Sequence, residues 1–358
     1  MPNSQQLIDE INQRKKEFIT DGYPMSIGEI INMYKDGELI INPDFQRFFR
    51  WSLTQQTKFI ESIFLGIPIP PLFVYQNEKG KWELVDGLQR VSTILKFVGV
   101  LKKDESNLEP PTELEETEML PNLGMITWKT LPVEPLQLDF KRTKLKVEII
   151  KSQSDPEAKF EVFQRLNTGG SLLSAQEFRN CLLVMIDKTF YDWLAGLSTD
   201  ENFRNCIDLS DKLLDERYDM ELALRFFVFP KFAFSYSDVD DYLTESMKSL
   251  LKETAFDREQ EALRFKKSFA VLNEIAEDQV FKKNFRGKFL ESYFEAIGIG
   301  VGQNIEDYST SEDMKVLERK IKEIEDQKVF AERKGSGTNT KVRVAHIVPF
   351  GIAYFKHE

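Results

Sequence analysis

Three clusters of polar residues interrupt apolar stretches in the first half of this 358-residue chain, at the ends of predicted elements, where proteins usually present binding groups. The first is the run Val85-Asp86-Gly87-Leu88-Gln89-Arg90-Val91-Ser92-Thr93, in which a predicted strand passes through a glycine into a predicted helix. The N-terminus of a helix carries unpaired N–H groups and the positive end of the helix dipole, so it attracts phosphate. Gly87 would let a ligand approach the backbone, and Arg90 would bind two phosphate oxygens at once. Ser92 or Thr93 would add a hydroxyl or help to hold a metal ion.

An ordinary corner between a strand and a helix explains the same run equally well. In that interpretation Asp86 caps the helix N-terminus and Arg90 forms an ion pair on the surface. The pattern of this cluster alone does not distinguish the two interpretations, so the other two clusters are needed to separate them.

The second cluster consists of Gln46, Arg47, Arg50 and Trp51, in a stretch without a clean period that predicts a structured loop. Two arginines beside an aromatic ring suit a phosphate group and a base that stacks on the ring. The alternative is a solvated loop in which Trp51 is buried.

The third cluster lies in the run Phe163-Gln164-Arg165-Leu166-Asn167-Thr168-Gly169-Gly170, where Arg165 and Asn167 end a predicted helix. A plain helix C-cap at Gly169 is the alternative explanation. The chain contains neither the GxxxxGK[ST] pattern nor a GxGxxG fingerprint, which excludes P-loop and Rossmann sites.

The composition limits which partners and sites are expected. With 48 basic and 59 acidic residues the chain has a formal net charge of -11, and its overall field repels nucleic acid. Contact with DNA would therefore need a local basic groove, for which the candidates are Arg47, Arg50, Arg142, Lys144 and Lys146.

Few residues are available for metal or thiol chemistry. Only two histidines occur, His346 and His357, so a histidine-rich metal site is excluded and a Ser-His-Asp triad is not expected. Cys181 and Cys206 are expected to be reduced, structural thiols, which favours the cytoplasm. The polar N-terminus lacks the apolar core of a signal peptide, and no stretch is long and apolar enough to span a membrane.

The elements that would position the clusters follow from periodicity and turn residues. Ser52 predicts the start of a helix that ends at Gly66. The apolar stretches 72–75 and 82–85 predict a β-hairpin, and its second strand leads into a helix that starts at Gly87.

The rest of the chain divides into an α+β part and an all-α part. We expect a helical arm over residues 1–20, a strand over 145–149, and an exposed acidic insertion over about 101–125. Helical patterns dominate after residue 180, and segments such as 212–230, 257–276 and 312–333 are predicted to be helical. The predicted domains are therefore residues 1–185 and residues 186–358.

Taken in order, these clusters resemble the N-terminal domain of GmrSD-type modification-dependent restriction endonucleases, over about residues 20–185. The resemblance rests on Pro43-Asp44-Phe45-Gln46-Arg47 with Trp51, Ile60-Glu61-Ser62-Ile63, Gly66-Ile67-Pro68-Ile69-Pro70, Asp86-Gly87-Leu88-Gln89-Arg90-Val91-Ser92-Thr93-Ile94, and the run 163–170 followed by Leu173 and Glu177.

The resemblance implies a compact ParB/sulfiredoxin-like α+β domain that binds a nucleotide, followed by a helical domain. Asp86 would be the catalytic residue and would hold Mg²⁺ or orient water. The other groups implied or suggested at the same pocket are Gly87, Gln89, Arg90, Ser92, Thr93, Gln46, Arg47, Arg50, Arg165 and Asn167. The family signature reads Asp-Gly-Gln-Gln-Arg, and Leu88 stands here in place of its first glutamine, which would weaken hydrolysis more than binding.

Full-length relatives carry a C-terminal HNH nuclease domain. Here Ala345-His346-Ile347-Val348-Pro349 resembles the first part of that motif, but the chain ends too soon afterwards for the metal-binding helix. The resemblance thus implies a stand-alone member, and His346 is expected to be a structural residue of a helix.

Two functions remain open on the sequence. The first is an NTP-binding switch of a prokaryotic restriction or anti-phage defence system, which would hydrolyse GTP, CTP or UTP with Mg²⁺. The second is a non-catalytic module that binds DNA or a partner, such as a separate nuclease or defence subunit. Nuclease activity of the chain itself is not expected.

Overall fold

The computed structural model describes residues 4–15, 19–41, 51–103, 107–151, 174–234, 238–333 and 340–357. The chain forms two compact units, residues 1–173 and 174–358. The first contains a five-stranded sheet with helices and the described part of the second contains helices, which confirms the predicted fold class. The predicted boundary at residue 185 would assign helix α8 (Ala175–Ile186) to the first unit, whereas its contacts place it in the second.

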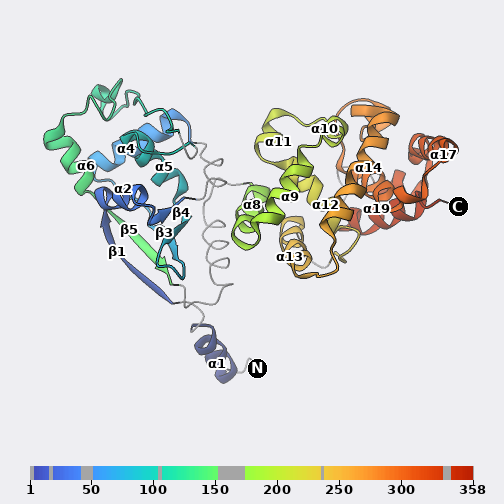
Figure 1. Cartoon of the computed structure of the whole chain (residues 1–358), viewed down its shortest axis with the longest axis horizontal. Helices are drawn as coiled ribbons and strands as arrows, with labels where there is room; N and C mark the ends of the chain where they lie inside the picture. Colours follow the sequence, from blue (N-terminus) through green and yellow to red (C-terminus); the bar gives the residue numbers. More distant parts are fainter. Residues whose placement is uncertain are drawn as a thin grey trace. The chain divides into compact units, whose positions relative to one another are not determined.

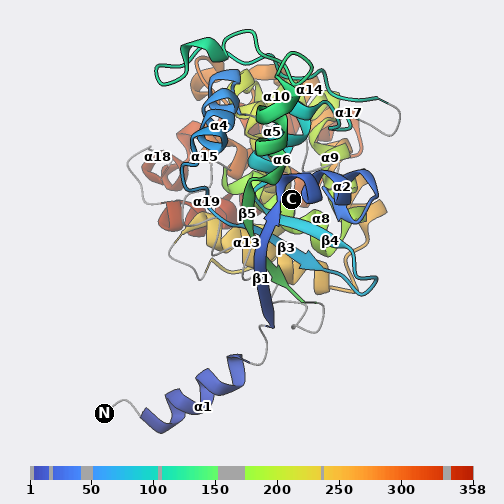
Figure 2. The same cartoon turned by 90° about the vertical axis from the view of Figure 1, so that its left-hand side faces the viewer.

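The sheet of the first unit has the strand order β1-β5-β3-β4-β2 (Figures 1 and 2). Strand β3 is antiparallel to β4 and parallel to β5, while β1 is antiparallel to β5 and β2 is parallel to β4. The strands are β1 (Thr20–Ser26), β2 (Leu39–Ile40), β3 (Leu72–Gln76), β4 (Trp82–Asp86) and β5 (Lys144–Ile150). The predicted hairpin and the strand over 145–149 are confirmed.

Strand β1 was not predicted, because Asp21, Gly22 and Pro24 are all unfavourable in strands. It forms because β1 is at the edge of the sheet, where the missing N–H of a proline can face away from the neighbouring strand. The expected helical arm over residues 1–20 is correspondingly shorter, since helix α1 spans Ser4–Lys15.

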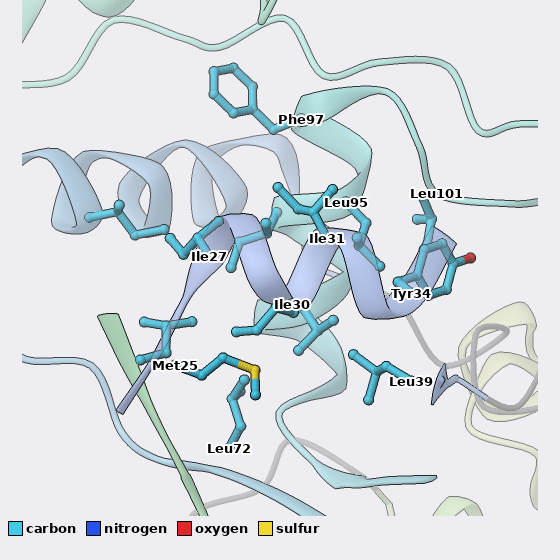
Figure 3. Close-up of a cluster of buried hydrophobic side chains, with 14 of the residues drawn as sticks. Met25, Ile27, Ile30, Ile31, Tyr34, Leu39, Leu72, Leu95, Phe97 and Leu101 are labelled. Atoms are coloured by element: carbon cyan, nitrogen blue, oxygen red, sulfur yellow. The ribbon is translucent and has the colours of Figure 1, made fainter. Parts of the chain in front are cut away.

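Four helices bury one face of this sheet: α2 (Ile27–Lys35), α4 (Leu53–Leu65), α5 (Leu88–Val98) and α6 (Leu138–Arg142). Figure 3 shows Ile27, Ile30 and Ile31 of α2 among the core side chains, which include Leu72 of β3 and Leu95 of α5. The predicted limits of α4 are confirmed: Ser52 and Gln55 form a capping box, and Gly66 ends the helix with a φ of 68°.

The acidic segment is largely exposed, as its composition predicts, but it also contributes side chains to the core. Its leucines Leu101, Leu114 and Leu123 are buried in the core of the first unit. The backbone N–H of Leu114 donates to Ile126 O at 2.9 Å, and Met125 N donates to Leu114 O at 2.8 Å. Because these leucines follow neither a helical nor a strand period, the many carboxylates around them hid their role.

The second unit is built from helices around a cluster of aromatic rings. Its helices are α8, α9 (Lys188–Ser198), α10 (Glu201–Ile207), α11 (Asp211–Asp215), α12 (Tyr218–Val228), α13 (Val239–Lys252), α14 (Arg258–Ala276), α15 (Glu291–Tyr293), α16 (Ile299–Asn304), α17 (Ser311–Lys322), α18 (Lys328–Arg333) and α19 (Thr340–Tyr354). No helix among the residues that the structure describes is long and apolar enough to cross a membrane.

The helical prediction is confirmed for 257–276 by α14 and also for 212–230 and 312–333, where each segment is divided by a short break. Arg217 adopts a left-handed conformation with a φ of 61° and separates α11 from α12. The 3-10 helix η7 (Ile324–Asp326) separates α17 from α18. Helix α18 buries Phe330 after its break, whereas no residue of α11 is buried.

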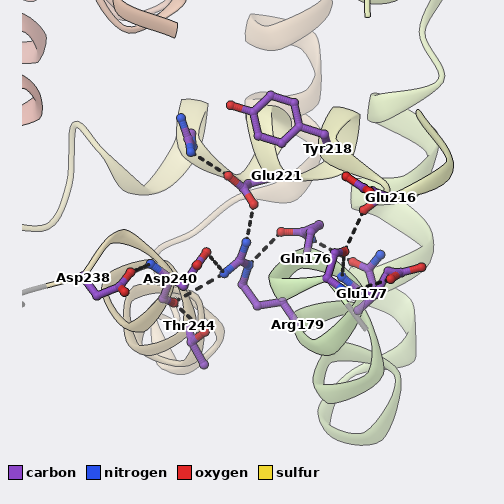
Figure 4. Close-up of polar contacts among 12 residues, drawn as sticks. Gln176, Glu177, Arg179, Glu216, Tyr218, Glu221, Asp238, Asp240 and Thr244 are labelled. Atoms are coloured by element: carbon purple, nitrogen blue, oxygen red, sulfur yellow. Dashed lines mark hydrogen bonds and ion pairs between the residues drawn. The ribbon is translucent and has the colours of Figure 1, made fainter. Parts of the chain in front are cut away.

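A network of buried charges joins the helices of the second unit. Arg179 of α8 is fully buried and donates to Glu221 of α12 at 2.5 Å and to Asp240 of α13 at 3.1 Å (Figure 4). Glu221 also accepts from Arg225 at 2.6 Å. Arg179, Glu221 and Arg225 therefore depend on one another to remain buried, whereas the Asp240 side chain is 54% exposed.

The network continues toward the last helix. Arg343 of α19 donates to Glu295 through Nε and Nη2, both at 2.8 Å, and to Glu291 at 2.5 Å. Arg225 Nη1 lies 3.3 Å from Glu291 and 3.7 Å from Glu295. The two arginines therefore share the same pair of glutamates.

Glu291 predicts a contribution to stability that is lost in acid, whereas burial raises the pKa of Glu295, whose contribution has the opposite sign. Although burial favours the neutral form of Glu291, the charges of Arg225 and Arg343 and the hydrogen bond from Tyr218 lower the pKa of this carboxyl to about 2. An acid whose pKa is lowered on folding stabilises the protein above its unfolded pKa of about 4.3, and this contribution is lost as the pH falls toward 2. Chemical unfolding midpoints measured from pH 6 to pH 2 should therefore fall, and Glu291→Gln should flatten this fall. An equally steep fall in the variant would contradict the assignment.

Candidate functional site

A β-bulge ends strand β4 next to the first polar cluster. Leu84 pairs with Val74, but Asp86 pairs with Phe73, so Val85 is the extra residue. Bulges often lie beside functional sites because they redirect the residue that follows. Here the bulge determines how Asp86 leaves the sheet immediately before helix α5.

Gly87 is the N-cap residue of α5, with a φ of 102°. A Cβ atom at this position would collide with Leu72 Cδ2, so both the conformation and the space require glycine. Because the N-cap residue is a glycine, it has no side chain that could cap the first turn of α5. The alternative in which Asp86 is the N-cap residue of this helix is therefore wrong.

Arg90 joins the start of α5 to the segment before β3. Its Nη1 donates to Pro70 O at 2.5 Å and to Pro71 O at 2.9 Å. Its Nη2 donates to Asp86 Oδ2 at 2.6 Å. The ion pair of the alternative interpretation is thus present, although the Arg90 side chain is only 13% exposed. In this arrangement Arg90 positions the corner, with both N–H groups of Nη1 already used.

Gln89 binds the backbone at the end of the second cluster. Its Oε1 accepts a hydrogen bond from Trp51 N at 3.1 Å. The Trp51 ring meets Phe59 edge-on, with ring centroids 5.4 Å apart, and packs against the core. Trp51 is therefore a packing residue, as the alternative for this cluster expects.

Two residues that flank the second cluster in the sequence, Ile41 and Trp51, lie at the end of the sheet where the first cluster begins. Gln46, Arg47 and Arg50 lie outside the described residues, but Ile41 and Trp51 on either side are described. Strands β2 and β4 are parallel, so Ile41 leaves β2 at the same edge of the sheet at which Asp86 leaves β4. Trp51 returns to Gln89 in the first turn of α5. Trp51 thus contacts the first turn of α5, and Ile41 lies at the same end of the sheet as Asp86.

Ser92 and Thr93 are fully buried inside the unit. Thr93 Oγ1 donates to Gln89 O at 2.7 Å within α5. Ser92 Oγ has no hydrogen-bond partner among the described residues. Neither hydroxyl reaches the surface of the corner in this conformation, so their predicted contacts with phosphate would need a rearrangement of α5.

The third cluster is not brought to the corner by the described part of the chain. Arg165 and Asn167 lie outside the described residues. Strand β5, which precedes them, ends with Ile150 beside Tyr75, at the edge of the sheet opposite Asp86. The predicted start of α8 is confirmed, since Ser174 and Glu177 form a capping box.

The remaining groups considered from the sequence are potential metal ligands, His346, the basic groove and the cysteines. No group of three potential metal ligands occurs among the described residues, and His346 is exposed on α19. Lys146 of the predicted basic groove lies 2.6 Å from Glu148, and the negative charge of this carboxylate opposes the attraction of Lys146 for DNA phosphates. Burial raises the pKa of Cys206 to about 12, consistent with a structural thiol.

The sequence analysis missed the buried polar residues that organise both units. Gln56, Gln176, Arg179 and Asn180 are each at most 5% exposed. Their signal was a polar residue at a helical position that an apolar residue would normally fill.

Residues 27–184 match the model of a known family, the GmrSD restriction endonuclease, N-terminal domain. The match confirms the resemblance for residues 27–184, which are less than half of the chain. It extends from α2 into α8, and therefore crosses the boundary between the two compact units. Neither the curated proteins nor the solved structures give a match.

Proposed function

We propose, on the premise that residues 27–184 form a GmrSD restriction endonuclease N-terminal domain, that this chain binds a nucleoside triphosphate at the start of α5 and acts as an NTP-responsive switch. The phosphates would lie against the first turn of α5, at the edge of the sheet where β2 and β4 end. A separate nuclease subunit or DNA would be the partner that responds to the nucleotide.

The observation that carries this proposal is the start of α5, which follows a β-bulge and a glycine at the end of strand β4. The φ of 102° at Gly87 requires glycine, and this N-cap residue has no side chain to cap the helix. Trp51, the residue after Arg50 in the sequence, donates its backbone N–H to Gln89 in the first turn of α5. Backbone N–H groups and arginines together are the usual ligands of phosphate.

A magnesium ion at this position would be coordinated both by the protein and by the phosphates of the nucleotide. Mg²⁺ is commonly bound by one or two carboxylates together with substrate phosphates and water. Asp86 supplies one carboxylate: its Oδ2 accepts from Arg90, and Oδ1 has no hydrogen-bond partner among the described residues. A bound Mg²⁺ would neutralise phosphate charge. Asp86 would hold it or orient water, while the chain's other groups would fix the phosphates in place.

A charge placed in the first turn of α5 tests the proposal. Gln89→Glu keeps an oxygen that accepts from Trp51 N, and a carboxylate in a first turn suits the helix dipole, so the fold should be retained. The same charge repels phosphate, and we expect nucleotide affinity to fall about tenfold or more, which corresponds to about 1.4 kcal/mol. Titration calorimetry with GTP, CTP, UTP and ATP, each with Mg²⁺, measures this change.

Gln55→Glu is the matched control, because Gln55 lies in the first turn of α4, whose N-terminus Ser52 already caps. This variant should bind nucleotide like the wild-type protein. Absence of binding by the wild-type protein to all four nucleotides would refute the proposal. Equal nucleotide affinity of Gln89→Glu and the wild-type protein would show that the nucleotide does not bind at the start of α5.

A further inference from the structure

A buried carboxylate in helix α4 has no cation to pair with. Glu61 is 7% exposed, and the hydroxyl group of Thr117 donates a hydrogen bond to its Oε1. Among the residues that the structure describes, its Oε2 accepts no hydrogen bond and no lysine or arginine forms an ion pair with it. Glutamates are rarely buried without a cationic partner, because water stabilises their charge better than a protein interior does. Glu61 therefore lacks the group that usually accompanies a buried carboxylate.

Glu61 lies in the wall of a groove on the first unit. The groove has a volume of about 480 Å³ and lies between helix α4 and residues 115–119 of the acidic segment. Its charged lining consists of four glutamates and one lysine: Glu61, Glu115, Glu116, Glu118 and Lys58. Carboxylates that line one hollow make its potential negative, and the low dielectric of the walls concentrates that potential. The groove therefore attracts cations and repels phosphate.

Threonine side chains hold the carboxylates of the groove in place without neutralising them. Thr54 Oγ1 donates to Glu115 Oε2 at 2.8 Å, and the backbone N–H of Glu115 donates to Thr57 Oγ1 at 3.1 Å. The hydroxyl group of Thr117 fixes Glu61 in the same way. A hydroxyl group carries no charge, so the negative charge of these carboxylates remains uncompensated. The groove is thus preorganised for a cation before any ligand binds.

A basic side chain of a protein fits this groove better than a metal ion does. No group of three potential metal ligands occurs in the described part of the chain, although the groove contains four glutamates. The guanidinium group of arginine instead binds a carboxylate through two parallel N–H groups. Met119 also lines the groove and is 63% exposed, so it offers an apolar contact to the stem of an arginine. The groove is larger than one side chain, which leaves room for the adjoining residues of an extended segment.

We propose that this groove binds an extended basic segment of a partner protein, with an arginine of that segment paired to Glu61. The arginine would supply the missing cation, and the surrounding glutamates would select a basic segment over a neutral or acidic one. The acidic segment thereby gains a role, because Leu114 fixes it in the core while the glutamates after it line the groove. This inference does not rest on the proposed nucleotide site, which requires the opposite charge.

A fluorescent hexa-arginine peptide tests the inference with the full chain in the absence of nucleotide. Glu61→Gln removes the negative charge, while the amide oxygen can still accept the hydrogen bond from Thr117. In fluorescence anisotropy at fixed ionic strength, this variant should bind the peptide about tenfold more weakly than the wild-type protein. Glu113→Gln is the matched control and should bind like the wild type, because Glu113 is an exposed carboxylate of the same segment outside the groove lining.

Glu118→Gln keeps the test open if Glu61→Gln fails to fold, because Glu118 is exposed and its replacement should not disturb the core. It should also weaken binding of the peptide. Equal affinity of the wild-type protein and both groove variants would overturn the inference, since binding would then follow only the net charge of -11. Equally tight binding of a hexa-citrulline peptide, which has the same shape without the charge, would overturn it as well. Spermine that binds more tightly than the peptide, with the same dependence on Glu61, would replace the protein partner by a free polyamine.

Discussion

Replacing Glu295 by alanine should lower the free energy of unfolding by about 3–5 kcal/mol, the usual cost of removing one partner from a buried ion pair. Glu295 is fully buried and accepts both hydrogen bonds of the Arg343 fork at 2.8 Å. Arg225 lies 3.7 Å from the same carboxylate. Without Glu295, Arg343 would keep only Glu291, which it shares with Arg225, and part of the buried positive charge of the second unit would remain unpaired.

Urea unfolding of the full chain, followed by circular dichroism, measures this loss. The control is Glu306→Ala, because Glu306 pairs with Lys267 at 2.8 Å while its side chain is 71% exposed. Exposed pairs contribute about 0–1 kcal/mol, so this variant should resemble the wild type. A Glu295→Ala protein as stable as the control would show that the network tolerates the loss of a member.

Phe269→Ala should be similarly damaging, by about 3–5 kcal/mol, because it opens a cavity in a close-packed core. Phe269 on α14 is fully buried and lies among other rings, with centroids 4.5 Å from Phe265 and 4.7 Å from Phe203. No single neighbouring ring can move to fill the cavity left by Phe269→Ala, because the surrounding rings also pack on each other.

Leu263→Ala is the matched control, on the same helix and with its side chain 70% exposed. We expect a change within about 0.5 kcal/mol for this surface position. Thermal unfolding of both variants provides the comparison. If the two changes destabilise equally, the aromatic cluster is not the main core of the helical unit.

The sequence predicted elements whose signals are local. The hairpin of β3 and β4, helix α4 with its capping box, and helix α14 follow from turn residues, caps and periodicity within one segment. Strand β1 and the buried leucines of the acidic segment depend instead on partners far along the chain: Thr20 pairs with Ile150, and Leu114 packs in a core built by other elements. Such pairings leave little trace in local composition.

The candidate site shows the same division. The strand, glycine and helix of the first cluster were found where expected, and Asp86, Gly87, Gln89 and Arg90 lie together. Their partners were not predictable, because Arg90 binds carbonyls some twenty residues earlier and Gln89 binds Trp51. The structure gives each residue a more specific role. Gly87 is the N-cap residue of α5, whereas Arg90 and Gln89 form hydrogen bonds with the surrounding backbone.

The central claim is that phosphate binds at the start of α5. A crystal structure of the full chain with the nucleotide that binds in calorimetry, together with Mg²⁺, tests it most directly. The account predicts phosphate oxygens within about 3 Å of backbone N–H groups in the first turn of α5, with Arg47 or Arg50 on the opposite side. Phosphate density elsewhere, with the first turn of α5 in contact with no ligand, would contradict it.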